Sequence, residues 1–153
     1  MKEGPYFEDL PVGTSFETGT HTVTLEEIEA FAKVYDPQPF HLDAVAAEKS
    51  FFKRQVASGW HTTAVAMKLL VESGFFGSTG LLGLGVDELR WPRPVLPGDV
   101  LRVRNEVVES LPSSSGKNAR IRWAMTMLNQ NGEVVLTMNP LTLFPGRSRS
   151  DAK

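Results

Sequence analysis

The sequence contains no cysteine and no long apolar run. Without cysteine, neither a disulfide framework nor a thiolate metal site can form. The longest apolar stretch, residues 64–71, contains Lys68 and is far shorter than the ~20 apolar residues of a membrane-spanning helix. The first residues, MKEGPYFEDLPVG, have acids and prolines where a secretory signal has a basic start and an apolar run. These absences predict a cytoplasmic protein with no membrane partner.

An excess of positive charge is also absent. The formal net charge is −2, whereas a protein that binds nucleic acid normally carries a clear basic excess, so nucleic acid is not an expected partner. Basic residues do gather in the second half of the chain, at Arg90, Arg93, Arg102, Arg104, Lys117, Arg120 and Arg122. Most of them alternate with apolar residues, as on the solvent face of a strand. A basic surface that meets a small phosphorylated ligand is the alternative interpretation.

Histidine is scarce, and the three residues His21, His41 and His61 are scattered along the chain. They form no local ligand spacing such as HxxxH, so no metal site is predicted. A length of 153 residues suits one compact domain, and 41% apolar with 22% charged residues is typical of a folded protein. We expect one domain over residues 1–146 and a disordered polar tail over residues 147–153.

The patterning along the chain predicts a strand and three helices, followed by four strands. Helices followed by strands indicate an α+β protein, in which an antiparallel sheet packs on the longest helix. A long buried helix wrapped by such a sheet is the hotdog arrangement. The predicted elements are strand 15–23, helices 25–35, 43–49 and 58–73, and strands 82–91, 100–110, 119–129 and 133–144.

The first predicted helix carries both a start and a stop signal. Thr24 and Glu27 have the spacing of a capping box, in which each side chain bonds the backbone of the other residue. Pro37 ends the helix, because the residue before a proline is driven out of the α region. Asp36 therefore lies at the helix end.

The third predicted helix, 58–73, is apolar on most of its surface and is therefore expected to be buried, with Trp60 and Met67 in the core. Ser58 can cap its N-terminus. The backbone amide of Gly59 then lies in the first turn, where amides have no partner inside the helix.

The stretch YDPQPFHLD, residues 35–43, places Asp36 and His41 five positions apart, with Pro37 and Pro39 between them. One interpretation is a helix stop followed by a rigid turn, because prolines and Asp are typical turn residues. The other is catalytic, because fixed proline φ angles reduce the freedom of the loop, and a carboxylate and an imidazole beside one water can move its protons. The two residues alone leave both interpretations open.

Residues 36–43 resemble the D-x-N-P-x-H-x-D signature of the MaoC-like, or R-specific, enoyl-CoA hydratases. The run Ala57-Ser58-Gly59-Trp60-His61 and the turn PVLPGDVL at residues 94–101, similar to a PVxPGDxL element of that family, agree in order along the chain. The resemblance extends over about residues 7–144. It implies a hotdog fold and reversible syn addition of water to a trans-2-enoyl thioester.

The resemblance also implies roles for individual residues. Asp36 matches the catalytic aspartate, the base for the oxygen that adds at C3, and His41 matches the histidine that supplies a proton to C2. The amide of Gly59 would donate to the thioester carbonyl oxygen, with Ser58 beside it as a substrate-binding candidate. The family asparagine is replaced by Gln38, which is longer by one methylene and puts the substrate preference in question.

The hotdog fold of the family further implies a homodimer or a higher assembly of dimers, with sheets joined edge to edge. The expected ligand is an acyl-CoA thioester, and no cofactor is expected besides this substrate. Arg93, Lys117 and Arg120 are candidates for contacts to the CoA phosphates. The sequence does not select the acyl group, or CoA over an acyl carrier protein.

Two alternatives to a hydratase stay open. Thioesterases of this fold commonly use a carboxylate on or near the central helix, where Glu72 is the only acid and lies near the far end. The other alternative is a non-catalytic hotdog protein that binds an acyl thioester or a partner. The intact Asp36 and His41 argue against it.

Overall fold

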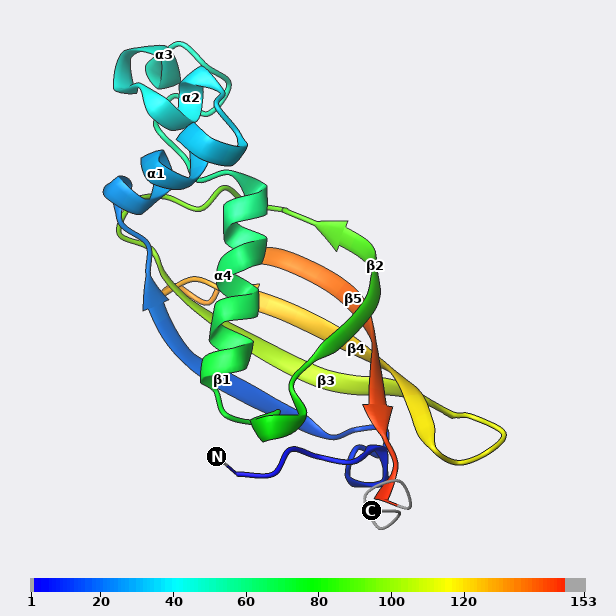
Figure 1. The fold of residues 1–153 in the computed structure, drawn as a ribbon. Coiled ribbons are helices and arrows are strands. Elements are labelled where there is room, and N and C mark those ends of the chain that lie inside the picture. The colour runs from blue at the N-terminus through cyan, green and yellow to red at the C-terminus, as the bar shows by residue number, and fades with distance from the viewer. Residues whose placement is uncertain (1, 148–153) are drawn as a thin grey trace.

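A computed structural model describes residues 2–147 and shows one antiparallel sheet with a long helix lying across it (Figure 1). The strand order is β1-β3-β4-β5-β2, and every neighbouring pair is antiparallel. The strands are β1 (Ser15–Thr22), β2 (Leu82–Arg90), β3 (Val100–Pro112), β4 (Asn118–Leu128) and β5 (Val134–Pro145). The helices are α1 (Leu25–Tyr35), α2 (Pro39–Leu42), α3 (Ala44–Glu48) and α4 (Gly59–Glu72), with 3-10 turns at Phe7–Asp9 and Gly77–Thr79. The predicted α+β class is confirmed.

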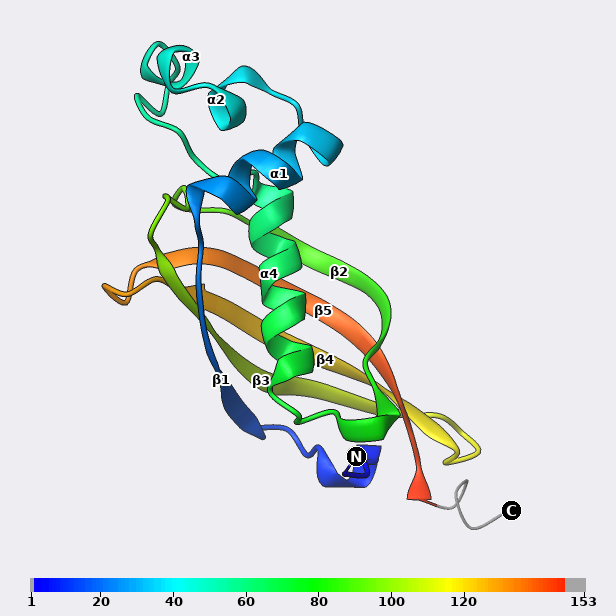
Figure 2. The ribbon, with the colours of Figure 1, turned by 60° about the vertical axis from the view of Figure 1, so that its left-hand side comes forward.

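The core lies between α4 and the face of the sheet that curves around it (Figure 2). Residues alternate along β4, so that every second side chain, including Ile121 and Trp123, points into this core. Helix α4 contributes a face that includes Ala66 and Leu70, both without exposed surface.

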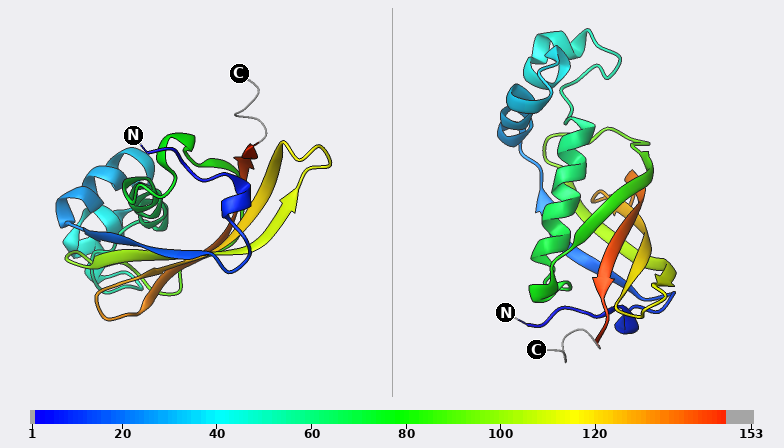
Figure 3. Two further views of the ribbon diagram at one scale, coloured as in Figure 1. Left: turned by 90° about the horizontal axis from the view of Figure 1, so that it is seen from below. Right: turned by 45° about the vertical axis from the view of Figure 1, so that its right-hand side comes forward.

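The other side of α4 is exposed, although this helix was predicted to be buried all round. Trp60 is 59% exposed, and Met67 and Val71 are exposed as well, so the assignment of Trp60 and Met67 to the core is wrong for the single chain. The reason is geometric: the sheet wraps one side of α4 and leaves the other uncovered (Figure 3). An apolar helix face without a covering layer indicates a surface that meets another molecule.

Helices α1, α2 and α3 form a small layer beyond one end of the sheet, next to the N-terminus of α4 (Figure 1). The predicted capping box is present, since the amide of Glu27 donates to Thr24 Oγ1 at 3.1 Å and the amide of Thr24 donates to Glu27 Oε1 at 2.7 Å. Helix α1 ends at Asp36, as predicted from Pro37. The segment 39–42, expected as part of a rigid turn, is the one-turn helix α2, because Pro39 stands in its first turn, where a fixed φ favours the helix.

The end of the described chain lies against the N-terminal segment. The amide of Arg147 donates to Glu8 Oε1 at 3.2 Å. The other residues of the predicted tail, 148–153, lie outside the described residues, so its disorder stays a prediction. No helix within residues 2–147 combines the length and the apolar character that crossing a membrane requires.

Candidate active site

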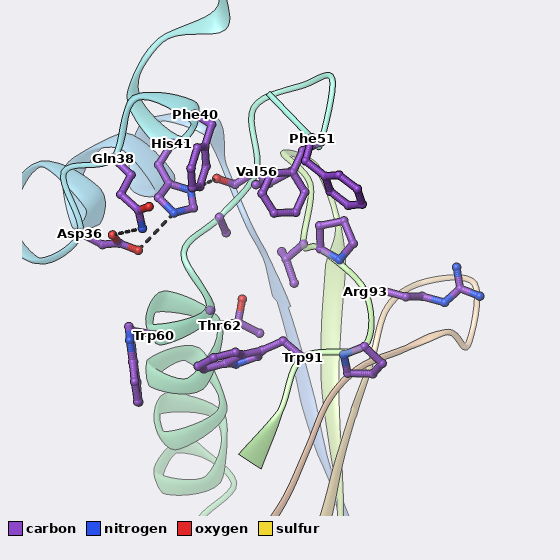
Figure 4. Close-up of a pocket in the computed structure, with 16 residues that line it drawn as sticks. Asp36, Gln38, Phe40, His41, Phe51, Val56, Trp60, Thr62, Trp91 and Arg93 are labelled. Atoms are coloured by element: carbon purple, nitrogen blue, oxygen red, sulfur yellow. Dashed lines mark hydrogen bonds and ion pairs between the residues drawn. The ribbon is translucent and has the colours of Figure 1, made fainter. Parts of the chain in front are cut away.

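The structure brings Asp36 and His41 into direct contact at the end of α1 and on α2. His41 Nε2 lies 3.1 Å from Asp36 Oδ2 (Figure 4). The imidazole is buried, with 4% of the residue exposed, and the carboxylate is half-buried. The end of α1 and the one-turn α2 therefore place an acid and an imidazole side by side, as the catalytic interpretation of YDPQPFHLD requires.

The backbone determines which nitrogen of His41 carries a hydrogen. His41 Nδ1 lies 2.6 Å from the carbonyl oxygen of Val56, and because a carbonyl only accepts, Nδ1 must donate. In a neutral ring Nε2 is then an acceptor. Its contact with a carboxylate oxygen is favourable only when one proton lies between the two groups. The geometry thus places a carboxylate and a ring nitrogen where a proton can pass between them.

Asp36 has two further polar neighbours. Gln38 Nε2 donates to Asp36 Oδ1 at 2.6 Å, and the Ser58 hydroxyl lowers the pKa of the carboxylate. Burial raises the pKa of Asp36, but the hydrogen bonds from Ser58 and Gln38, with the charge and hydrogen bond of His41, outweigh it and hold this pKa below its ordinary value of 3.8. Gln38, which departs from the family signature, therefore still contacts the catalytic candidate.

Gln55 is a positioning residue that the sequence did not single out. Its Nε2 donates to the backbone oxygen of His41 at 2.8 Å and to Glu29 Oε1 at 2.9 Å. These bonds connect the segment before α4 to both α1 and α2. Because Gln55 is distant from both partners in sequence, no local pattern indicates the contact.

A pocket of about 480 Å³ opens beside the pair. Its wall combines Asp36, Gln38 and His41 with aromatic and apolar side chains from the 51–57 segment and from the 91–95 segment (Figure 4). Gly59 and Thr62 from the start of α4 complete it. A mostly apolar pocket with a few convergent polar groups is typical of a small-molecule site.

Gly59 lies at the first turn of α4, and within residues 2–147 its amide donates to no protein acceptor. A Cβ at this position would lie 2.7 Å from two atoms of the Trp91 indole, so the ring approaches as closely as only glycine permits. Trp91 Nε1 also donates to Thr63 Oγ1 at 3.2 Å. The free amide at a helix N-terminus is a suitable donor for a developing oxyanion.

Ser58 and the three basic candidates for contacts to the CoA phosphates lie in different parts of the molecule. Ser58 is 1% exposed and does not line the pocket; it caps α4 by accepting from the amide of Trp60 at 3.2 Å, and it lowers the pKa of Asp36. Arg93 lines the pocket and pairs with Glu133 at 2.9 Å. Lys117 and Arg120 do not line it. They belong to the β3–β4 hairpin region, at the opposite end of the sheet from α1–α3 (Figure 1).

A second polar cluster lies beside the site. His21 Nε2 is 3.0 Å from both carboxylate oxygens of Glu27, and His61 Nε2 is 3.7 Å from Glu27 Oε2. The His61 ring stacks on Phe31 at 4.9 Å between centroids, consistent with a packing residue, and its buried Nδ1 has no hydrogen-bond partner within residues 2–147. Glu27 thus contacts His21 through the same carboxylate that caps α1. Among the described residues, no group of three His, Asp or Glu side chains is placed to hold a metal ion.

The fold and the Asp36–His41 pair together define a class, a single α+β domain with an acid–imidazole site at the start of its central helix. Residues 8–125 match the family described as MaoC like domain. The chain therefore belongs to the MaoC-like domain family.

Solved structures agree with this assignment. The MaoC-like dehydratase from Rhodospirillum rubrum is 44% identical with a TM-score of 0.89, over 94% of this chain and 99% of that chain. The unliganded R-hydratase PhaJ1 from Pseudomonas aeruginosa is 32% identical with a TM-score of 0.75, over 93% and 86% of the two chains. RV0216 from Mycobacterium tuberculosis, described as a double hotdog fold, is 22% identical with a TM-score of 0.75, over 94% and 44%.

The hotdog fold expected from the sequence is thus confirmed. Membership of the family places the chain among hydratases and dehydratases in the broad sense.

Proposed function

We propose that the protein catalyses the reversible syn hydration of a trans-2-enoyl-CoA to an R-3-hydroxyacyl-CoA. The observation that carries this proposal is the 3.1 Å contact between His41 Nε2 and Asp36 Oδ2 in the wall of a mostly apolar pocket. The similarity to an R-hydratase supports the stereochemistry of the product. An acyl-CoA is the proposed substrate, and Arg93 is the basic candidate that lines the pocket.

The pair supplies both proton transfers of the hydration. Asp36, whose low pKa keeps it ionised, accepts a proton from the water whose oxygen bonds C3. The protonated His41 gives the Nε2 proton to C2, on the same face. The amide of Gly59 donates to the thioester oxygen while negative charge develops there. Asp36 then returns its proton to Nε2 across their direct contact, which restores the starting state.

The proposal includes a homodimer. Strand β2 is an edge of the sheet, and its exposed residues include Leu82, Leu84 and Val86. Exposed strand edges pair readily with a second chain. Pairing of two β2 edges would join the sheets and cover the apolar face of α4 that carries Met67 and Val71.

The activity is tested by the loss of enoyl-thioester absorbance with crotonyl-CoA and longer analogues. We expect hydration by the wild type and a loss of at least about 100-fold in Asp36→Asn and His41→Ala, the usual range for removal of a general acid or base. Circular dichroism checks that both variants fold. Full turnover by either variant contradicts the assigned roles.

A thiol reagent separates hydration from the thioesterase alternative. Glu72 lies at the far end of α4 and pairs with the exposed Lys68, away from the pocket, so we expect no release of free CoA. Tight binding of thioesters without turnover over a broad substrate panel would instead favour a binding protein.

A further inference from the structure

A second cavity of about 270 Å³ lies between α4 and the inner face of the sheet. Thr63, Leu70 and the partly exposed Met67 of α4 line one side, and residues of all strands except β1 line the other. Its wall is mostly apolar, and none of the described residues that line it is charged. The strand glycines Gly83 and Gly85 contribute open space, since a Cβ at either would meet no atom within 4 Å.

One buried polar group in this wall lacks a partner. Asn105 is 1% exposed, and its Oδ1 makes no hydrogen bond within the described chain. It takes the inward position between Val103 and Val107 on β3, where its neighbours in the alternation are fully buried apolar residues. Thr142, another polar group of the wall, is satisfied, because it accepts from Trp123 Nε1 and donates to the oxygen of Ile121, both at 2.9 Å.

An unpaired buried amide is unfavourable for the folded protein. Leaving such a group without a hydrogen bond costs on the order of 1–3 kcal/mol, and an apolar residue here would pack without that cost. The arrangement is explained if a ligand supplies the missing hydrogen bond.

Trp91 lies between the cavity and the pocket that contains Asp36 and His41. The Trp91 indole is part of the pocket wall, packs on Gly59 and donates to Thr63, which belongs to the cavity wall. Met67 lies eight residues beyond Gly59, about 12 Å along the helix at a rise of ~1.5 Å per residue. An acyl tail that extends past Trp91 from a thioester at Gly59 would enter the cavity.

We propose that Asn105 is a specificity-determining residue, which selects acyl thioesters whose distal end carries a neutral hydrogen-bonding group such as a hydroxyl. A plain alkyl tail would leave the amide unpaired. A terminal carboxylate would be buried without a cation, since no Lys, Arg or His lines the cavity. This inference rests on the proposed hydratase function, whose site receives the other end of the same substrate.

The test uses trans-2-enoyl-CoA pairs over a series of chain lengths, each pair with and without a terminal hydroxyl. For wild type, the hydroxyl should raise kcat/KM about tenfold at the best length, the value of one good hydrogen bond made to an otherwise unpaired group. Asn105→Leu, similar in shape but apolar, should remove or reverse this preference. Met138→Leu changes another lining residue and should keep it.

The outcomes separate the two proposals. Equal rates for both members of every pair with wild type would overturn the role of Asn105, as when a water already satisfies the amide, and would leave the hydratase function standing. A preference that survives Asn105→Leu would overturn it as well. Absence of all turnover would contradict the hydratase function instead.

Calorimetric binding of the matching saturated acyl-CoAs to wild type then tests Asn105 without turnover. A Kd about tenfold lower for the hydroxylated member is expected, and equal Kd values would overturn the inference. If Asn105→Leu does not fold, this binding measurement on wild type still tests the role of Asn105.

Discussion

At the residue scale, the site depends on the side chains that contact the Asp36 carboxylate. Asp36 accepts a hydrogen bond from Gln38, its pKa is lowered further by Ser58, and it faces His41, whose orientation is set by the Val56 carbonyl. The proposed reaction needs an ionised Asp36, and these neighbours favour that form. Gln38, which stands where the family signature has asparagine, therefore contacts Asp36 directly in this chain.

Replacement of Gln38 by Met, which keeps the length but removes the donor, should raise the pKa of Asp36 toward its ordinary value. The folded-state pKa is low, so the stability that Asp36 contributes is present above pH ~3.8 and is lost as the pH falls through the lowered value. NMR titration of the Asp36 carboxyl measures the shift directly. An unchanged pKa in Gln38→Met would contradict the role assigned to this hydrogen bond.

At the element scale, the ends of helices carry the site. Helix α1 ends at Asp36, α2 presents His41, and α4 begins at Gly59. The capping box made the start of α1 predictable and Pro37 made its end predictable, because both signals are local. The contacts of Gln55 with His41 and of Trp91 with Gly59 were not predictable, because they join residues that are far apart in sequence.

His61 of α4, which stacks on Phe31 of α1, makes the free energy of unfolding depend on pH. Burial lowers the pKa of His61, more than the nearby Glu27 carboxylate raises it, and the His21 and His41 charges lower it further. Between the lowered pKa of His61 and its ordinary value of about 6.5, the unfolded state therefore binds more protons than the folded state. The free energy of unfolding then falls as the pH drops through this range.

His61→Phe, which retains a ring to stack on Phe31, should weaken this dependence. Unfolding free energies from urea titrations at about pH 7.5 and about pH 5.5 measure the effect. The difference between the two pH values should be smaller in the variant than in wild type. The same difference in both proteins would show that His61 is not the responsible group.

At the scale of the whole molecule, the single chain leaves apolar surface uncovered. The hotdog architecture was predictable from the order of helices and strands, and the apolar pattern correctly identified α4 as the central helix. The exposure of Trp60 and Met67 was not predictable, because periodicity shows that a helix is apolar all round but not which neighbour covers each side. A second copy of the chain that packs on this side of α4 would explain why the helix is apolar all round and why Trp60 and Met67 are exposed in the single chain.

We therefore expect a dimer that a charge on the β2 edge disrupts. Leu84→Arg places a cation on this exposed edge strand and should shift the protein to a monomer. Sedimentation velocity measures the change. Leu111→Arg is the matched control, since Leu111 is similarly exposed but lies on β3, and it should leave the dimer intact. A dimer that persists in Leu84→Arg would contradict the edge-to-edge arrangement.

The central claim is that Asp36 and His41 together add water to one face of an enoyl thioester. Its most direct test is hydration of a trans-2-enoyl-CoA in deuterated water, with analysis of the configuration at C3 and of the deuterium at C2. The account predicts an R-3-hydroxyacyl-CoA with syn addition in the wild type, and no product above background with Asp36→Asn. An S product, anti addition or undiminished turnover by Asp36→Asn would contradict it.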